Sequence, residues 1–380
     1  MIERKKDLSQ IKELIKDFSA TAILGARQVG KTTIARQIGA DYYFDLENPR
    51  DLAKFENPQL TLEKLTGLVT IDEIQRKPDL FPLLRFLIDQ DFKRKFLILG
   101  SASRDLIRQS SETLAGRIAY YHLGGLRITD TGKNNIDKLW LLGRFPKAFI
   151  ARSSSSAFKW LNNYISTFLE RDIPQLGINI PANTLRKFWS MLAHYHGQII
   201  NYSEIASSFG LSEYTVKKYL DILCGTFMVR TLQPWFANIG KRLVKKPKIY
   251  IKDSGILHSL LSIDSMDSLL SHNKLGASWE GFALEIIAGV LGKPDNELFF
   301  WRTHAGNEID LFWQEHGKNW AVEFKFADAP TLTAPAQAAT KDLNLQHLWI
   351  IYPGTDRYKL SEKVTVLPLK EIGTEWDYNH

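Results

Sequence analysis

The segment at residues 25–32 has residue types and spacing that suit phosphate chemistry. Gly25-Ala26-Arg27-Gln28-Val29-Gly30-Lys31-Thr32 follows an apolar run and leads into a plausible helix over residues 31–38. Glycines let the backbone curl, so that several N–H groups and the start of a helix converge on a phosphate. Lys31 would place a cation between the β- and γ-phosphates, and the Thr32 hydroxyl would ligate Mg²⁺. We therefore expect five residues to bind ATP here: Gly25, Gly30, Lys31, Thr32 and Thr33.

Two acids end the next informative run, at residues 68–73. Leu68-Val69-Thr70-Ile71 reads as a buried strand, and Asp72 and Glu73 follow it. Ligands gather at the carboxyl edge of an open α/β sheet, where these acids would lie. We expect Asp72 to hold Mg²⁺ through water and Glu73 to orient and polarise the attacking water. A pair of exposed turn acids is the alternative, which the preceding phosphate loop disfavours.

A hydroxyl follows the apolar run at residues 96–100. Ser101 would lie between the Asp72 strand and the γ-phosphate, where it could help to position the water. The alternative is that it caps the helix beginning near Arg104.

Four ionisable residues near the C-terminus could form a second site: Glu280, Asp310, Glu323 and Lys325. A strand's period of two puts Glu323 and Lys325 on one face and leaves the intervening apolar residues, up to Phe326, buried on the other. Phosphodiester hydrolysis uses such a set. Asp310 and Glu323 would hold Mg²⁺ with Glu280 completing the metal shell, and Lys325 would favour hydroxide or stabilise the developing charge.

Residues 199–220 have the pattern of a helix–turn–helix. Apolar residues at helical spacing form one stripe on each side of Gly210, which supplies the turn. Ser212 is the expected N-cap of the second helix. Two strands are predicted next, over residues 227–235 and 248–251, as in a winged helix.

A basic stretch lies between these two strands. Residues 241–248 hold five basic residues and no acid. We expect this wing and the second helix, with Tyr214, Lys217 and Lys218, to bind DNA phosphates. The alternative is that the unit packs domains or binds a protein, and that the basic run is a solvated hairpin.

Positioning these residues requires two α/β layers and a helical region between them. Strands are predicted at residues 21–25, 42–45, 68–71, 96–100 and 118–123, alternating with helices such as 31–38 and 81–89, which indicates a mainly parallel sheet. The C-terminal layer is predicted from a helix at 279–290 and strands at 297–302, 309–314, 320–326 and 348–351. The expected domains are 1–127, 128–198 (helical), 199–265 and 266–380.

Composition bounds the remaining possibilities. The 380 residues are 44% hydrophobic and 24% charged, which excludes collagen-like, low-complexity and wholly disordered chains. The net charge of +7 permits contact with nucleic acid but does not require it. Cys224 is the only cysteine, so neither an internal disulfide nor a cysteine-based zinc site can form. Without a signal peptide or a bilayer-spanning run, we expect a soluble cytoplasmic protein with no membrane partner.

The N-terminal motifs resemble those of AAA-type P-loop ATPases. More narrowly, the chain resembles a prokaryotic family of uncharacterised ATPases that join such a module to a C-terminal domain of unknown function. The marks of this resemblance lie at residues 25–33, 68–75, 100–103, 114–117, 170–173 and 247–255. The resemblance implies that Arg117 lies near the γ-phosphate, in cis or toward a neighbouring subunit, where its charge would stabilise the transition state. The alternative is a surface charge at a helix end.

The C-terminal set resembles the PD-(D/E)xK nuclease fold, in the variant related to archaeal Holliday-junction resolvases. Glu308-Ile309-Asp310 stands where that fold has Pro-Asp, so Glu308 could be mistaken for the ligand that we assign to Asp310. The resemblance implies a restriction-endonuclease-like α/β domain after a winged helix, in an ATPase that acts on DNA. The alternative is a nucleotide-gated signalling or scaffold ATPase whose winged helix contacts protein and whose nuclease-like domain is inactive. A second copy of the chain or another protein are further expected partners.

Overall fold

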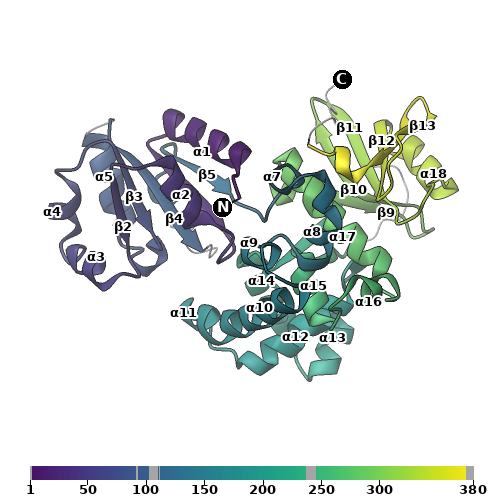
Figure 1. Ribbon diagram of the computed structural model, residues 1–380, viewed down its shortest axis with the longest axis horizontal. Coiled ribbons are helices and arrows are strands. Elements are labelled where there is room, and N and C mark those ends of the chain that lie inside the picture. Colours follow the sequence, from purple (N-terminus) through teal and green to yellow (C-terminus); the bar gives the residue numbers. More distant parts are fainter. Residues whose placement is uncertain (1, 91–92, 102–109, 111, 237–244, 374–380) are drawn as a thin grey trace. The chain divides into compact units, whose positions relative to one another are not determined.

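The computed structural model describes residues 2–90, 93–101, 110, 112–236 and 245–373. The chain divides into two compact units, one formed by residues 1–126 with 225–227 and the other by residues 127–224 with 228–380 (Figure 1). The predicted boundary after residue 127 lies next to this division. The predicted boundaries after residues 198 and 265 fall inside the second unit.

The first unit contains a parallel sheet with strand order β2-β3-β4-β1-β5. Strands β1 and β3 are buried along almost their whole length, which explains their continuous apolar sequences. The strands are β1 Ala20–Gly25, β2 Tyr42–Asp45, β3 Leu68–Asp72, β4 Lys95–Ser101 and β5 Ile118–His122. The predicted α/β layer with a mainly parallel sheet is confirmed.

Helices connect these strands and pack against them. They are α1 Lys5–Asp17, α2 Lys31–Ile38, α3 Pro49–Lys54, α4 Pro58–Leu62 and α5 Leu80–Gln90. The side chains of Asn48 and Asn57 cap α3 and α4, each followed by proline at the first helical position. Leu84 and Leu87 of α5 belong to the same buried cluster as Val69 of β3.

The second unit begins with helices joined by aromatic contacts. The helices are α7 Ile128–Thr131, α8 Ile136–Leu142, α9 Pro146–Phe149, α10 Ser154–Thr167, α11 Ile173–Gln175 and α12 Ala182–His194, with a π-helical turn at Phe168–Asp172. Tyr164 on α10 lies 4.9 Å from Phe145 between ring centroids, and Phe168 lies 5.3 Å from Trp189. These contacts pack α10 against the start of α9, and the π-helical turn against α12.

Two short helices follow at the predicted helix–turn–helix. They are α13 Tyr202–Phe209 and α14 Glu213–Gly225, and Gly210 between them has φ +62°, a left-handed conformation that glycine adopts at low cost. Ser212 Oγ accepts a hydrogen bond from Thr215 N at 3.1 Å, as the predicted N-cap should.

One nine-stranded sheet runs through the rest of the second unit, in the order β13-β14-β12-β11-β10-β9-β7-β8-β6. Its strands are β6 Gln198–Ile199, β7 Val229–Pro234, β8 Lys248–Ile251, β9 Phe299–Arg302, β10 Glu308–Glu315, β11 Lys318–Phe324, β12 Leu345–Tyr352, β13 Tyr358–Ser361 and β14 Val364–Pro368. Strand β7 pairs in parallel with β9, with Gln233 opposite Phe299. The strands predicted for the wing therefore continue into the C-terminal sheet.

Helices connect the strands of this sheet. They are α15 Ser254–Leu260, α16 Met266–Leu270, α17 Leu275–Leu291 and α18 Ala334–Asp342. Ala336 and Ala339 of α18 pack into a buried cluster with Phe312 and Ile350. The expectation that Phe326 is buried was wrong: β11 ends at Phe324, and the Phe326 side chain is 38% exposed.

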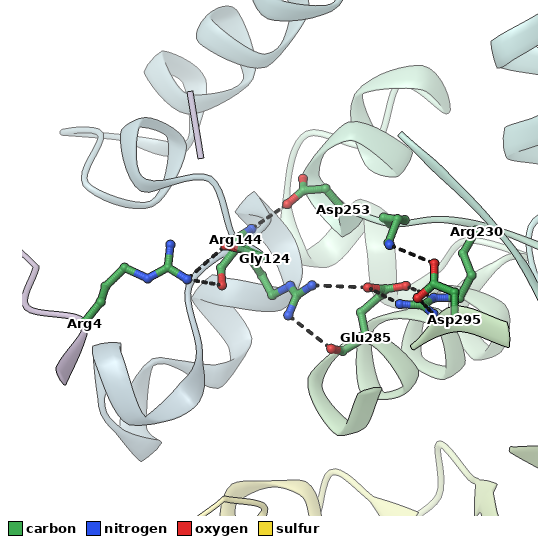
Figure 2. A network of polar contacts seen from close by, with 9 residues as sticks. Arg4, Gly124, Arg144, Arg230, Asp253, Glu285 and Asp295 are labelled. Carbon is green, nitrogen blue, oxygen red and sulfur yellow. Dashed lines mark hydrogen bonds and ion pairs between the residues drawn. The ribbon is translucent and has the colours of Figure 1, made fainter. Parts of the chain in front are cut away.

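A buried ion network joins three elements of the second unit (Figure 2). Arg230 on β7 pairs with Glu285 on α17 and, at 2.6 Å, with Asp295. Arg144, which follows α8, contacts the Glu285 carboxylate at 3.5 Å. The two arginines and the two acids balance each other's charges. The network therefore connects β7 to α17 and to the residue that follows α8. Within the described part of the chain, no helix has the length and apolar character needed to cross a membrane.

Candidate nucleotide site and C-terminal acid cluster

The loop between β1 and α2 has the backbone of a phosphate cradle. Gly25 lies so close to its neighbours that a Cβ there would stand 2.4 Å from the carbonyl oxygen of Leu123. Gly30 has φ +110°, a conformation that side chains rarely adopt. The two glycines are therefore required by close packing at one end of the loop and by the turn into α2 at the other.

Lys31 folds back over this loop. Its buried Nζ donates hydrogen bonds to the carbonyl oxygens of Gly25 and Ala26, each at 3.0 Å. The ammonium group is thereby held above the cradle by neutral acceptors.

The structure brings Thr32 and Asp72 together from positions 40 residues apart. Thr32 Oγ1 donates to Asp72 Oδ2 at 2.9 Å, and the Tyr43 hydroxyl donates to the same oxygen at 2.5 Å. Asp72 is buried at the carboxyl end of β3, the edge that the sequence predicted. Thr33 lies one residue further along α2 and is exposed.

Tyr43 was missed by the sequence analysis. It lies on β2, which pairs with β3 so that Asp45 stands opposite Asp72. Burial, and then the hydrogen bond to Asp72, raise the pKa of Tyr43 well above its ordinary value, so it remains a donor. The available signal was a tyrosine near the end of the neighbouring predicted strand.

Glu73 occupies an unusual backbone position beside Asp72. It has φ +57°, which costs on the order of 1–3 kcal/mol for a residue other than glycine. Gln75 Nε2 donates to its Oε2. Burial raises the pKa of Glu73, although Lys31 and the hydrogen bond from Gln75 act in the opposite direction.

Arg4 is a further residue at the loop that the sequence analysis did not identify. Its buried guanidinium donates to the carbonyl oxygen of Val29 at 3.1 Å. It also donates to the carbonyl oxygen of Gly124 at 2.9 Å (Figure 2). Its Nε pairs with Asp7 at 2.7 Å, and Tyr121 donates to the same carboxylate at 2.5 Å. Arg4 therefore connects the phosphate loop to the start of α1 and to the chain after β5.

Ser101 lies at the carboxyl end of β4, whereas Arg117 lies at the opposite end of the parallel strands, just before β5. The main chain of Ser101 stands opposite Gly25, and its side chain lies outside the described part of the structure. Arg117 precedes β5, where its carbonyl oxygen accepts from Ala20 N. At about 3.3 Å per residue, the five steps from Ala20 to Gly25 separate Arg117 from the loop by about 17 Å. The Arg117 guanidinium makes a bidentate pair with Asp89. A role for Arg117 near the γ-phosphate, in cis or toward a neighbouring subunit, stays a prediction.

Three acidic residues at the predicted C-terminal site surround the side chain of Lys248. Lys248 Nζ lies 3.1 Å from Glu280 Oε1, 2.5 Å from Glu308 Oε1 and 3.0 Å from Asp310 Oδ1. Lys325 pairs with Glu323 at 2.7 Å. Burial, and then the charge of Asp310, raise the pKa values of both Glu280 and Glu323.

The predicted metal shell of Glu280, Asp310 and Glu323 is not formed. Among the described residues, no three His, Cys, Asp or Glu side chains are arranged to hold a metal ion. The physical reason is Lys248, which was assigned to the basic wing but is only 3% exposed and occupies the space between the carboxylates. Lys248 is the first residue of β8, whose other residues are apolar or aromatic, and it directly follows the basic stretch in the sequence.

The exposed face of α14 carries the residues named for DNA contact. Tyr214 is 79% exposed, and Lys217 and Lys218 are also exposed. Lys245 and Lys246 of the basic stretch are exposed, whereas residues 241–244 lie outside the described part of the chain.

Comparison with protein families identifies the class of the first unit. Residues 17–131 match an AAA domain, residues 133–267 match a domain of unknown function (DUF8612), and residues 275–372 match a second one (DUF4143). The first unit is therefore an AAA-type P-loop ATPase domain, which supports ATP binding and hydrolysis.

Comparison with whole proteins identifies the family. The chain is 45% identical over 378 residues to the uncharacterized proteins Rv2008c of Mycobacterium tuberculosis and Mb2031c of Mycobacterium bovis, covering 98% of this chain and 85% of each relative. The chain belongs to the family of these mycobacterial proteins.

Two solved structures from archaea show limited overall likeness. The Walker-type ATPase paby2304 of Pyrococcus abyssi is 14% identical with a TM-score of 0.49, over 69% of this chain and 96% of that one. A signal-transduction ATPase with a tetratricopeptide-repeat sensor, PH0952 of Pyrococcus horikoshii, has 14% identity and a TM-score of 0.25, over 78% of this chain and 46% of that one.

Proposed function

We propose that the chain is a Mg²⁺-dependent ATPase whose second unit binds DNA through α14. The observation that carries the ATPase part is the hydrogen bond between Thr32 and Asp72 beside the glycine cradle. A hydroxyl and a carboxylate are oxygen donors of the kind that Mg²⁺ prefers. When bound, the ion would neutralise charge on the phosphates, and Thr32 and Asp72 would hold it.

The remaining residues of the site have separable roles in this proposal. Lys31 exchanges its carbonyl partners for phosphate oxygens, which are stronger acceptors because they are charged. Glu73, oriented by Gln75, accepts a hydrogen bond from the attacking water. Tyr43 holds the Asp72 carboxylate in place through the oxygen that it shares with Thr32.

Nucleotide binding and phosphate release, measured on the same variants, test these roles. We expect Lys31→Ala to abolish ATP binding and turnover together, because the cation over the cradle is lost. We expect Glu73→Gln to retain binding and to lower turnover by at least about 100-fold, the usual contribution of a general base. Lys12→Ala, at an exposed lysine on α1, is the matched control. Hydrolysis by Lys31→Ala at the rate of the wild type would contradict the proposal.

The DNA part rests on the exposed aromatic and basic face of α14. Tyr214, Lys217 and Lys218 present one ring and two ammonium groups to solvent on a single helix. Phosphate contacts by lysines provide affinity, and a ring provides stacking or contact with a groove.

A nucleotide-gated scaffold ATPase is the second candidate, and the C-terminal acid cluster favours it over an active nuclease. Lys248 engages the carboxylates that a nuclease would offer to a metal ion. In this alternative, α14 contacts protein instead of DNA.

A further inference from the structure

Lys248 is held by carboxylates from two separate elements. Glu280 comes from α17, and Glu308 and Asp310 come from β10, while Lys248 itself lies on β8. The three carboxylate oxygens stand 2.5 to 3.1 Å from its Nζ. These separations suit an ammonium group, whereas Mg²⁺ requires ligand oxygens at about 2.0–2.1 Å.

Several carboxylate oxygens of this cluster already have partners, whereas one oxygen of Glu323 has none among the described residues. Asp310 Oδ1 contacts Lys248, and its Oδ2 accepts from Phe324 N at 3.0 Å. Glu280 Oε1 accepts from Lys248 and from the Tyr250 hydroxyl. Glu323 Oε1 pairs with Lys325, and its buried Oε2 makes no hydrogen bond within the described part of the chain.

Charge complementarity explains why Lys248 lies in this position. Carboxylates of Glu280, Glu308 and Asp310 surround its Nζ. The ammonium group therefore balances part of the negative charge around it.

We propose that the Lys248 ammonium takes the place of a divalent cation among Glu280, Glu308 and Asp310. The cluster then binds no metal in the native protein, and its role is to fasten β8 to β10 and α17. The position is nevertheless one that a cation fits, because removing Lys248 leaves three carboxylates directed at one point.

The test is Mn²⁺ binding by the full-length protein without nucleotide, measured by calorimetry and by thermal unfolding. We expect Lys248→Met to bind Mn²⁺ at least about tenfold more tightly than the wild type, because ligand charge sets the affinity of such sites. Mn²⁺ should raise the melting temperature of Lys248→Met and leave that of the wild type unchanged. Adding Asp310→Asn to Lys248→Met should remove both effects.

Two further variants serve as controls. Lys246→Met changes an exposed lysine two residues away and should behave as the wild type does. Asp310→Asn alone should bind as much Mn²⁺ as the wild type, a comparison that does not depend on the folding of Lys248→Met. Wild-type binding that disappears in Asp310→Asn would overturn the proposal, and so would a folded Lys248→Met that gains no Mn²⁺ binding.

Discussion

At the scale of single residues, the nucleotide site depends on side chains that do not bind nucleotide themselves but hold the phosphate loop in place. Arg4 illustrates this, since its guanidinium connects Val29 of the phosphate loop with Gly124 and with the Asp7 carboxylate. Asp7 is fully buried, so it needs a positive partner. The stability of the loop is therefore tied to the first residues of α1.

Arg4→Ala tests this connection. Breaking a buried ion pair by removing one partner costs about 3–5 kcal/mol, so we expect the free energy of unfolding of the first unit to fall by about that amount. Lys5→Ala, at an exposed neighbouring residue, should change it by less than about 0.5 kcal/mol. Urea denaturation measures both. Equal stability of Arg4→Ala and Lys5→Ala would contradict the assignment.

The sequence predicted some residues of the site better than others. Lys31, Thr32 and Asp72 follow from fixed spacing along the chain, and Thr32 and Asp72 meet as expected. Arg4 and Tyr43 could not be found in this way, because the groups that place them at the site are distant in sequence: Val29 and Gly124 for Arg4, and Asp72 for Tyr43. Lys248 was misjudged because a sequence does not distinguish a solvated lysine from one buried among acids.

At the scale of elements, α14 combines a buried face and an exposed one. Val216, Leu220 and Leu223 are buried, while Tyr214, Lys217 and Lys218 face solvent. The apolar spacing predicted the first group, and the second followed from it by helical geometry. If the exposed face binds DNA, the positive charges of its lysines contribute to the affinity, so the affinity should depend on the salt concentration.

The salt dependence of DNA affinity tests this face. Each phosphate contact contributes a slope of about −0.9 to log K against log salt for duplex DNA. We expect Lys217→Ala with Lys218→Ala to weaken binding and to reduce the slope by up to about 2, whereas Lys159→Ala on α10 leaves both unchanged. No retention of DNA by the wild type at low salt would rule out the DNA part and favour the scaffold alternative.

At the scale of the whole molecule, the sequence predicts individual strands better than it predicts which strands pair over long distances in the chain. The five strands of the first sheet were predicted because each is a compact apolar run. The pairing of β7 with β9 was not predicted. Gln233 and Phe299 are 66 positions apart, and nothing in the local sequence of either strand indicates its partner. The short edge strand β13 was also missed, since its alternate residues are exposed.

Buried histidines make the second unit sensitive to acid. Burial, and then the charge of His258, lower the pKa of His196 to about 3. The unfolded chain therefore binds a proton below about pH 6.5 that the folded chain does not, so stability falls as the pH drops through this range. The raised pKa values of Glu280 and Glu323 act in the opposite sense, which requires a comparison between variants.

His196→Asn supplies that comparison, because its amide oxygen can still accept from Ile251 N, as His196 Nδ1 does at 2.9 Å. Between pH 7 and pH 5, we expect the wild type to lose about 2 kcal/mol of unfolding free energy relative to the variant. Urea denaturation at the two pH values measures this difference. A constant gap between the two proteins would show that His196 does not titrate on unfolding.

The central claim is that the first unit holds a triphosphate in the cradle formed by Gly25, Gly30 and Lys31. A crystal structure with Mg²⁺ and a non-hydrolysable ATP analogue tests it most directly. We predict that Lys31 Nζ leaves the carbonyl oxygens of Gly25 and Ala26 for a phosphate oxygen, and that Thr32 and Asp72 meet at the metal ion. A saturating analogue bound elsewhere, with Lys31 still on those carbonyls, would contradict the account.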